Sequence, residues 1–245
     1  MLRLPILTGP PNEEPRLGAS FHISQHPGRV RHSTEDWAAG EARDGRLACA
    51  VCDGMGGMRH GDRAARAVAE RFLSLCLEDP RSLSATWPPS PRRVQLELAV
   101  AMACLQAELR ERRVATTFTG LALHGLSGRL YHVGDSRAYL VRDGHARQLS
   151  RDHRLDDPAG TRLSQALGSP NHDLLECADL RLEPGDRLLL CSDGFTQSGL
   201  EGQALVEVLV RQGRDEDVPR LLVEEALSRG AEDNLSLVWI IPEAA

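Results

Sequence analysis

The order of strand-like and helix-like segments predicts an α+β fold, a four-layer α-β-β-α sandwich of two mostly antiparallel sheets flanked by helix pairs. Hairpin turns such as Asp44-Gly45, Ser127-Gly128 and Asp143-Gly144 join many of the strand-like runs, which favours antiparallel pairing over β-α-β crossovers. The helix-like segments come in two pairs, separated by a long run of strands. Two helix pairs can each cover the outer face of one sheet, so we expect the two sheets to pack against each other in the middle.

Short apolar runs bounded by turn residues predict the strands. They cover 20–25, an extended course over 30–36, two strands on either side of Asp44-Gly45, 116–124, 129–134, 138–142, 174–182, 187–192 and 234–241. Apolar residues at helical spacing predict helices near 62–77, from Ser90 to about 109, 201–212 and 218–229. Ser90 followed by Pro91 is typical of a helix N-terminus.

Length and composition indicate one globular domain over 19–245, preceded by a flexible leader over 1–18 that prolines interrupt. No apolar run approaches the roughly 20 residues of a membrane span, and the leader lacks the apolar core of a signal peptide. We therefore expect a cytoplasmic protein without a membrane span. The net charge of -6 argues against nucleic acid as the main partner.

All 29 residues of the Lys+Arg total are arginine. The absence of lysine excludes Schiff-base chemistry and a P-loop lysine, and it leaves arginine as the one permanently cationic side chain for binding phosphate. Six cysteines occur, and the pair Cys49 and Cys52 has C-x-x-C spacing. No second pair follows, so we interpret Cys49, Cys52, Cys76, Cys104 and Cys191 as small core residues in a reducing compartment rather than zinc ligands or disulfides.

Acidic residues recur where predicted strands begin or end. Asp53 follows an apolar run and precedes three glycines within four residues, in the stretch VCDGMGG. Glycines let backbone carbonyls approach a ligand, and hard cations such as Mg²⁺ or Mn²⁺ take carboxylate and carbonyl oxygens. An Asp-Gly turn after a strand is also ordinary hairpin chemistry. Four further acids lie at comparable positions: Asp36, Asp135, Asp193 and Asp233. If the five converge, they form a site for two or three metal ions.

These residues resemble the metal-dependent Ser/Thr protein phosphatases, the PPM family or type 2C. The resemblance runs from about Phe21 to Ile241 and depends on eight motifs in the family's order. They are G-x-V-R-x-x-x-E-D at 28–36, VCDGMGG with Gly61-Asp62, ATTFTGLAL from Ala115, HVGDSRAYL from His132, QLSRDH from Gln148, LSQALGS from Leu163, GDRLLLCSDG from Gly185, and EDN at 232–234. The family fold, a β-sandwich flanked by helix pairs, agrees with the strand order above.

The resemblance implies a role for each matching residue, with two or three Mn²⁺ or Mg²⁺ ions as cofactors. Asp53 would bridge two metals, the carbonyl of Gly54 would complete one of them, and Asp193 and Asp233 would bind the other. Asp36, supported by Glu35, would hold the metals' waters or reach a metal, and Asp135 would share a third, weaker metal with Asp193. Arg31 would clamp the substrate phosphate. Asn234 would support the site from outside the ligand set.

The same resemblance implies hydrolysis of phosphoserine and phosphothreonine in proteins by a metal-activated water, and a Ser/Thr kinase that makes the substrates.

Three departures from the family pattern matter. Thr34 stands where Asn is usual, Met55 stands where many eukaryotic members have histidine, and the stretch 152–163 is some twenty residues shorter than the flap of bacterial relatives. Asp152 and His153 in that stretch are candidate substrate contacts, whereas Asp62 and Asp186 are interpreted as bracing turns.

Two rival functions stay open on the sequence. A non-catalytic module could keep the fold and bind phosphoproteins, and the short flap would favour it. A two-metal phosphodiesterase or nuclease would use a similar acid set, but the acidic net charge argues against it.

Overall fold

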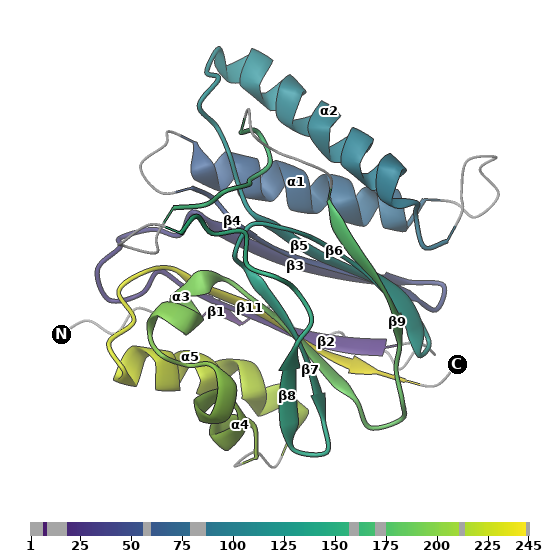
Figure 1. Cartoon of the computed structure of the whole chain (residues 1–245), viewed down its shortest axis with the longest axis vertical. Helices are drawn as coiled ribbons and strands as arrows, with labels where there is room; N and C mark the ends of the chain where they lie inside the picture. The colour runs from purple at the N-terminus through teal and green to yellow at the C-terminus, as the bar shows by residue number, and fades with distance from the viewer. Residues whose placement is uncertain are drawn as a thin grey trace.

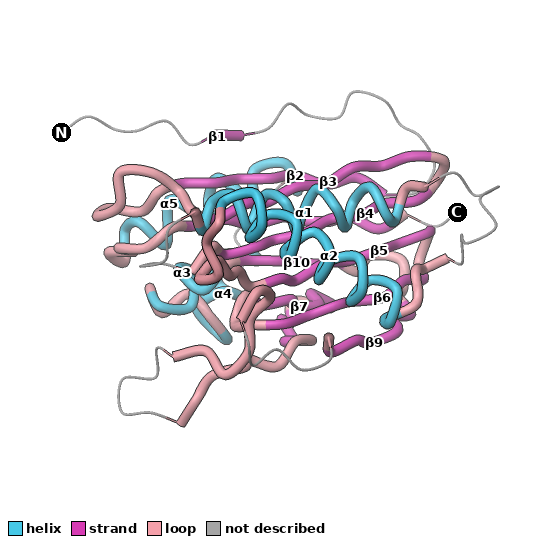
Figure 2. Tube along the Cα trace, turned by 90° about the horizontal axis from the view of Figure 1, so that it is seen from above, coloured by secondary structure: helices cyan, strands magenta, loops and turns pink. Residues whose placement is uncertain are grey.

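Four layers of secondary structure make up the computed structural model, which describes residues 7–8, 19–55, 60–78, 87–156, 162–169, 175–210 and 214–243. Figure 1 shows α1 and α2 on one outer face, two stacked sheets in the middle, and α4 and α5 on the other outer face. Figure 2, seen from the side of α1 and α2, shows the strands running side by side beneath these helices. The predicted four-layer arrangement is confirmed.

The two sheets are antiparallel throughout the described strands. The six-stranded sheet has the order β1 (Leu7–Thr8), β2 (Ala19–His26), β11 (Leu235–Pro242), β10 (Arg187–Cys191), β7 (Arg137–Arg142) and β8 (His145–Gln148). The five-stranded sheet has the order β3 (Asp36–Arg43), β4 (Arg46–Asp53), β5 (Phe118–His124), β6 (Ser127–Val133) and β9 (Glu176–Arg181). Neighbours along the chain pair through hairpins, as the turn residues predict.

The helices follow the predicted apolar stripes, with one addition. The long helices are α1 (Gly61–Cys76), α2 (Pro91–Leu109), α4 (Gly202–Val210) and α5 (Val218–Ser228). Ser90 caps α2, because its hydroxyl accepts a hydrogen bond from the backbone N–H of Arg93 at 3.3 Å. A five-residue helix that the sequence did not predict, α3 (Asp193–Gln197), follows β10 directly, and the short 3-10 turn η1 (Asp215–Asp217) precedes α5.

Three apolar layers fill the spaces between the four structural layers. The middle one packs the inner faces of both sheets, with Val51 and Leu121 from one sheet against Leu190 and Val238 from the other. The outer layers lie under α1 and α2, and under α3, α4 and α5. Burial of these side chains provides the main driving force for the fold.

Several local predictions need correction or stay open. Cys49, Cys52, Cys76 and Cys191 are buried and unbonded, as expected, but Cys104 is exposed on α2. Within the expected leader, Leu7 and Thr8 pair with β2 and extend the six-stranded sheet. The division into a leader and one domain over 19–245 remains a prediction. None of the described helices is long and apolar enough to cross a membrane.

Candidate metal centre

The acids singled out in the sequence converge at one end of the sandwich. Asp36 at the start of β3 lies opposite Asp53 at the end of β4 in the strand register. One carboxylate oxygen from each of Asp53, Asp135 and Asp193 can be chosen so that all three lie within 4.8 Å of one another. These side chains come from the end of β4, the turn after β6 and the first turn of α3. Both sheets therefore contribute to the centre.

The backbone of Asp53 is fixed by two threonines that the sequence analysis did not single out. Its N–H donates to Thr117 Oγ1 at 2.9 Å, and its carbonyl accepts from the Thr117 N–H and the Thr116 hydroxyl, each at 2.9 Å. The Thr117 hydroxyl also bonds Ser136 at 2.7 Å. Because Ser136 follows Asp135, this bond links the turn that bears Asp135, through Thr117, to the backbone of Asp53.

Gly54 lies where only a glycine fits. Its N–H donates to the Glu35 carbonyl at 3.1 Å. A Cβ on Gly54 would lie 2.3 Å from the carbonyl carbon of Gly61 at the start of α1, and 2.6 Å from the Glu35 carbonyl oxygen. This close packing holds the residue after Asp53 directly against the start of α1.

Asn234 connects the loop that bears Arg31 to the start of β11. Its Oδ1 accepts from the Glu35 N–H at 2.8 Å, and its Nδ2 donates to the carbonyls of Pro27 and Ser33 at 3.0 and 3.1 Å. Arg31 belongs to this loop, and its Nε lies 3.2 Å from Asp233 Oδ1. The guanidinium is about half exposed, so it borders the acidic centre and still faces solvent.

The substitution at Thr34 keeps a local turn intact. Thr34 Oγ1 accepts a hydrogen bond from the Asp36 N–H at 3.1 Å. A threonine hydroxyl can form this bond as an asparagine side chain does. Thr34 therefore preserves the hydrogen bond to the Asp36 N–H at this turn.

Burial and mutual repulsion raise the pKa values of these carboxyl groups. Burial raises the pKa of Asp36 to about 7, and burial followed by the charge of Asp193 raises that of Asp135 to about 7 as well. Burial and then the charges of Asp36 and Asp193 raise the pKa of Asp53 well above its ordinary value. Negative charge is concentrated beyond what the nearby arginines balance, which is a common property of cation sites.

The donor set fits Mg²⁺ or Mn²⁺. Every candidate ligand is a carboxylate or carbonyl oxygen, the atom type that hard cations prefer. Asp36 is almost fully buried, and its Oδ2 accepts no hydrogen bond from any residue that the structure describes. A buried carboxylate oxygen without a donor is costly unless a cation or water satisfies it.

Arg154 and Gln197 also reach the centre, although the sequence analysis named neither. Arg154 contacts both Asp135 and Asp193, and Gln197 Nε2 donates to Asp193 Oδ2. The expected substrate contacts nearby are engaged elsewhere. His153 is buried, and Asp152 forms a bidentate ion pair with Arg137. Arg154 directly follows the QLSRDH motif in the sequence, and this position was the only sequence feature that could have indicated its place near the centre.

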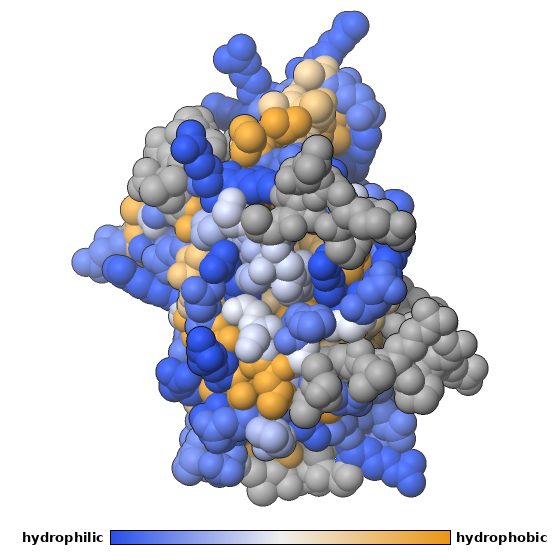
Figure 3. Space-filling model, turned by 90° about the vertical axis from the view of Figure 1, so that its right-hand side faces the viewer, coloured by the Kyte–Doolittle hydropathy of each residue, from blue (hydrophilic) through white to orange (hydrophobic). Residues whose placement is uncertain are grey.

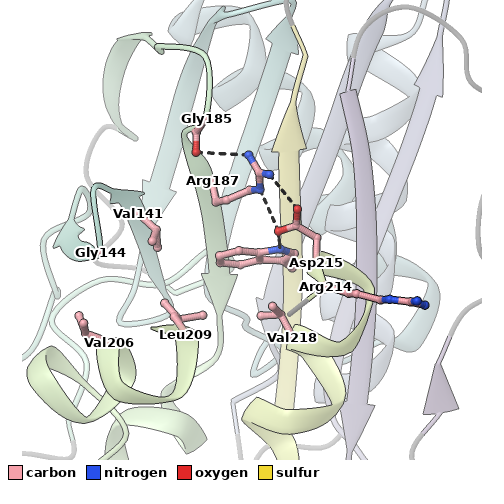
Figure 4. Close-up of a pocket in the computed structure, with 10 residues that line it drawn as sticks. Val141, Gly144, Gly185, Arg187, Val206, Leu209, Arg214, Asp215 and Val218 are labelled. Carbon is pink, nitrogen blue, oxygen red and sulfur yellow. Dashed lines mark hydrogen bonds and ion pairs between the residues drawn. The ribbon is translucent and has the colours of Figure 1, made fainter. Parts of the chain in front are cut away.

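A separate hollow of about 340 Å³ lies on the outer side of the six-stranded sheet, between β10, α4 and the start of α5 (Figure 4). Val141, Leu209 and Val218 line it together with Trp239, whose indole N–H donates to Asp215. Arg187 completes a bidentate ion pair with the same carboxylate. This hollow contains none of the clustered acids, so it is distinct from the metal centre.

Comparison with curated proteins finds phosphatases from several bacteria. The chain is 28% identical to the serine/threonine phosphatase stp of Listeria innocua over 236 residues, which are 87% of this chain and 92% of the relative. It is 31% identical to the serine/threonine protein phosphatase PstP of Mycobacterium tuberculosis over 227 residues, 86% of this chain but 42% of PstP. The second match therefore covers less than half of that longer relative.

Solved structures share the fold over nearly the whole chain. The crystal structure of M. tuberculosis PstP superposes with a TM-score of 0.78 at 24% identity and covers 93% of this chain. PppA of Pseudomonas aeruginosa superposes with a TM-score of 0.73 at 28% identity and covers 91%. A further structure of the PstP catalytic domain, with a TM-score of 0.76 at 24% identity, contains two manganese ions.

The sandwich with its all-oxygen centre defines a class of metal-dependent hydrolases. The family model for protein phosphatase 2C matches residues 30–227, which is most of the chain and includes every proposed ligand except Asp233. The chain belongs to the protein phosphatase 2C family. It is a metal-dependent protein serine/threonine phosphatase.

Proposed function

We propose that this chain hydrolyses phosphoserine and phosphothreonine at the acidic end of the sandwich, where Asp53 would be a ligand of both metal ions. Asp193 and Asp233 would complete the ligands of one ion, and the carbonyl of Gly54 those of the other. Asp36 would accept hydrogen bonds from their water ligands or bind one ion directly. The convergence of the Asp53, Asp135 and Asp193 oxygens within 4.8 Å is the observation that carries this proposal.

When bound, the two ions activate a water molecule for in-line attack on phosphorus and stabilise the charge that develops on the phosphoryl oxygens. The chain's own contribution is to hold the ligands still. Thr116 and Thr117 fix the backbone of Asp53, and Gly54 fixes the turn that follows. Such prior placement lowers the cost of reaching the transition state.

Arg31 is the proposed phosphate clamp. A guanidinium offers two parallel N–H donors that match two phosphate oxygens. Asn234 anchors its loop through three hydrogen bonds, and Asp233 holds the guanidinium beside the acids until substrate arrives. The half-exposed position of Arg31 lets it meet a phosphorylated side chain on a protein surface.

Leaving-group protonation falls to water. Met55, next to Gly54, has a thioether that carries no proton. A serine or threonine alkoxide is strongly basic and requires a proton as the bond to phosphorus breaks. The reaction should therefore be slower for phosphothreonine peptides than for aryl phosphates, whose leaving groups hardly require one.

The substrates are phosphoproteins, and we propose that a Ser/Thr kinase produces them in the cytoplasm. The rival binding module is disfavoured because every acid of the expected metal centre and Arg31 are present. The nuclease alternative predicts cleavage of bis-p-nitrophenyl phosphate, whereas a phosphomonoesterase should leave this diester intact.

Substitution of two neighbouring arginines tests the clamp. Arg31→Ala should raise KM for a phosphothreonine peptide and lower kcat/KM about thirtyfold, because a charge-assisted contact worth roughly 2 kcal/mol is lost. Arg29→Ala is the matched control, since Arg29 is an exposed arginine on the same loop. Release of inorganic phosphate in excess Mn²⁺ measures both. Equal defects in the two variants would contradict the assignment of Arg31.

A further inference from the structure

Arg154 inserts a positive charge into the corner of the centre between Asp135 and Asp193. Its Nε donates to Asp135 Oδ2 at 3.0 Å, and its Nη2 donates to Asp193 Oδ2 at 3.4 Å. Both carboxylates are largely buried, with 6% and 13% of their side chains exposed. One guanidinium therefore spans two acids from separate segments, the turn after β6 and the first turn of α3.

The backbone around Arg154 is held on two sides. On one side, the His153 N–H donates to the Gly134 carbonyl at 2.8 Å, and the Gly134 N–H donates to His153 Nδ1 at 3.1 Å. On the other side, Arg154 forms an antiparallel bridge with Leu163. The described residues on the two sides of the shortened stretch thus pair with each other, and His153 pairs with the turn that bears Asp135. These backbone contacts hold Arg154 beside the centre.

A metal ion in this corner would compete with Arg154 for the same two carboxylates. An ion bound by Asp135 and Asp193 would lie about 2.1 Å from carboxylate oxygens. The Oδ2 atoms of both groups already accept hydrogen bonds from the guanidinium. Two cations competing for one pair of oxygens repel each other strongly in a partly buried site.

We propose that Arg154 is a built-in cation that takes the place of a third metal ion, so that this centre binds two ions and not three. The inference rests on the proposed two-metal site and revises the role that the family resemblance implies for Asp135. Asp135 then serves as the anchor of Arg154, and Arg154 in turn holds Asp193 for the ion that Asp193 shares with Asp53.

Metal stoichiometry tests this proposal directly. Manganese bound per folded chain is measured by equilibrium dialysis and elemental analysis at saturating Mn²⁺, with folding checked by thermal melting. We expect two ions for the unaltered chain, three for Arg154→Met, and two again for Arg154→Lys, because an ammonium keeps the charge. Arg162→Ala is the matched control and should bind two, because Arg162 is an exposed arginine whose carbonyl accepts from the backbone N–H of Leu155, next to Arg154.

A double variant identifies where the extra ion binds. Arg154→Met combined with Asp135→Asn should return the count to two, because the third ion loses a ligand. Three ions in the unaltered chain, or two in Arg154→Met, would overturn the proposal. Two ions in Arg154→Met together with a raised KM would show that Arg154 binds substrate instead. Fewer than two ions in the unaltered chain would refute the two-metal centre itself.

Discussion

Strand β10 connects two charged regions whose acids behave in opposite ways. Just before it, Asp186 binds Arg142, and its first residue, Arg187, binds Asp215. The Arg142 hydrogen bond lowers the pKa of Asp186, and for Asp215 the hydrogen bonds from Arg187 and Trp239 outweigh burial and lower the pKa. Beyond its other end lies Asp193, whose pKa burial raises. One strand thus joins a structural cluster to a functional one.

The difference lies in the balance of charge rather than in the residue types. At the structural end Asp186 and Asp215 each pair with an arginine, so the charges stabilise the folded state locally. At the functional end five acids share Arg31 and Arg154 among the described residues. The excess negative charge costs stability in the metal-free chain, and cations restore it. The turn-bracing role expected for Asp186 fits its hydrogen bond from the Glu183 N–H at 2.8 Å.

The largest expected effect follows from removing one acid at the functional end. Asp53→Asn should lower kcat at least about a hundredfold, because the proposed ligand of both metal ions is lost. The metal-free variant should melt no lower than the unaltered chain, since Asp36 and Asp193 no longer repel a third charge. Mn²⁺-dependent phosphate release and thermal melting in EDTA measure the two quantities. A variant with full activity would contradict the metal assignment.

The same kind of substitution at the structural end should reverse the pattern. Asp215→Ala leaves Arg187 and the Trp239 indole N–H without their acceptor. We expect the free energy of unfolding to fall by about 1–2 kcal/mol. This value is modest because the carboxylate is about one-third exposed and solvent weakens its ion pair. Urea unfolding measures this, while kcat/KM should stay within about twofold. Glu216→Ala, at the exposed neighbour, is the control, and an activity loss in Asp215→Ala would break the contrast.

Proton release on metal binding should sharpen the comparison. Asp36 and Asp135 have pKa values of about 7 in the metal-free fold, against about 4 in an unfolded chain. Their raised values favour the protonated folded form, so their contribution to stability is complete below about pH 4 and is lost as pH rises towards 7. Mn²⁺ binds the ionised form and should displace protons at pH 6 but few at pH 8. Calorimetry in buffers of different ionisation enthalpy measures the count, and equal release at both pH values would contradict these pKa shifts.

The smallest effect concerns Thr34, which supports the functional end without touching metal. Thr34→Val removes the acceptor for the Asp36 N–H. If this hydrogen bond contributes about 1 kcal/mol to holding Asp36 in place, its loss predicts a roughly fivefold weaker affinity for Mn²⁺ at pH 7.5. Ser33→Ala, at the preceding position, serves as the control. Unchanged affinity in Thr34→Val would show that the strand register alone positions Asp36.

The sequence predicted the elements whose signals are local. Hairpin turns such as Asp44-Gly45 and the apolar stripe of α1 depend on neighbours within a few residues, and the structure confirms them. Helix α3 was missed because five residues are too few to show a helical period. The outer face of α2 was misjudged at Cys104 because Leu96 and Val100 are also exposed there, so its apolar residues extend beyond one stripe.

At the metal centre, the sequence predicted the acidic residues, but it did not predict the side chains that hydrogen-bond to them. Strand-end positions and the family motifs pointed to Asp53 and Asp193, which the structure brings together. The Arg154 contact with Asp135 spans 19 residues and depends on how the shortened stretch folds back. Thr117 lay within a motif but carried no signal that its hydroxyl would bind the backbone of Asp53.

The sheet order described above has a consequence for behaviour in concentrated solution. Strand β9 ends the five-stranded sheet, and an edge strand is a template on which another chain can add. Its side chains are mostly exposed, and they include Glu176, Asp179 and Arg181, with Asp179 paired to Arg129 across the sheet. Figure 3 shows a largely hydrophilic face on the right-hand side of the molecule, with apolar residues in separate patches. Charges along an edge strand discourage edge-to-edge association, so β9 is a poor template for the addition of another chain.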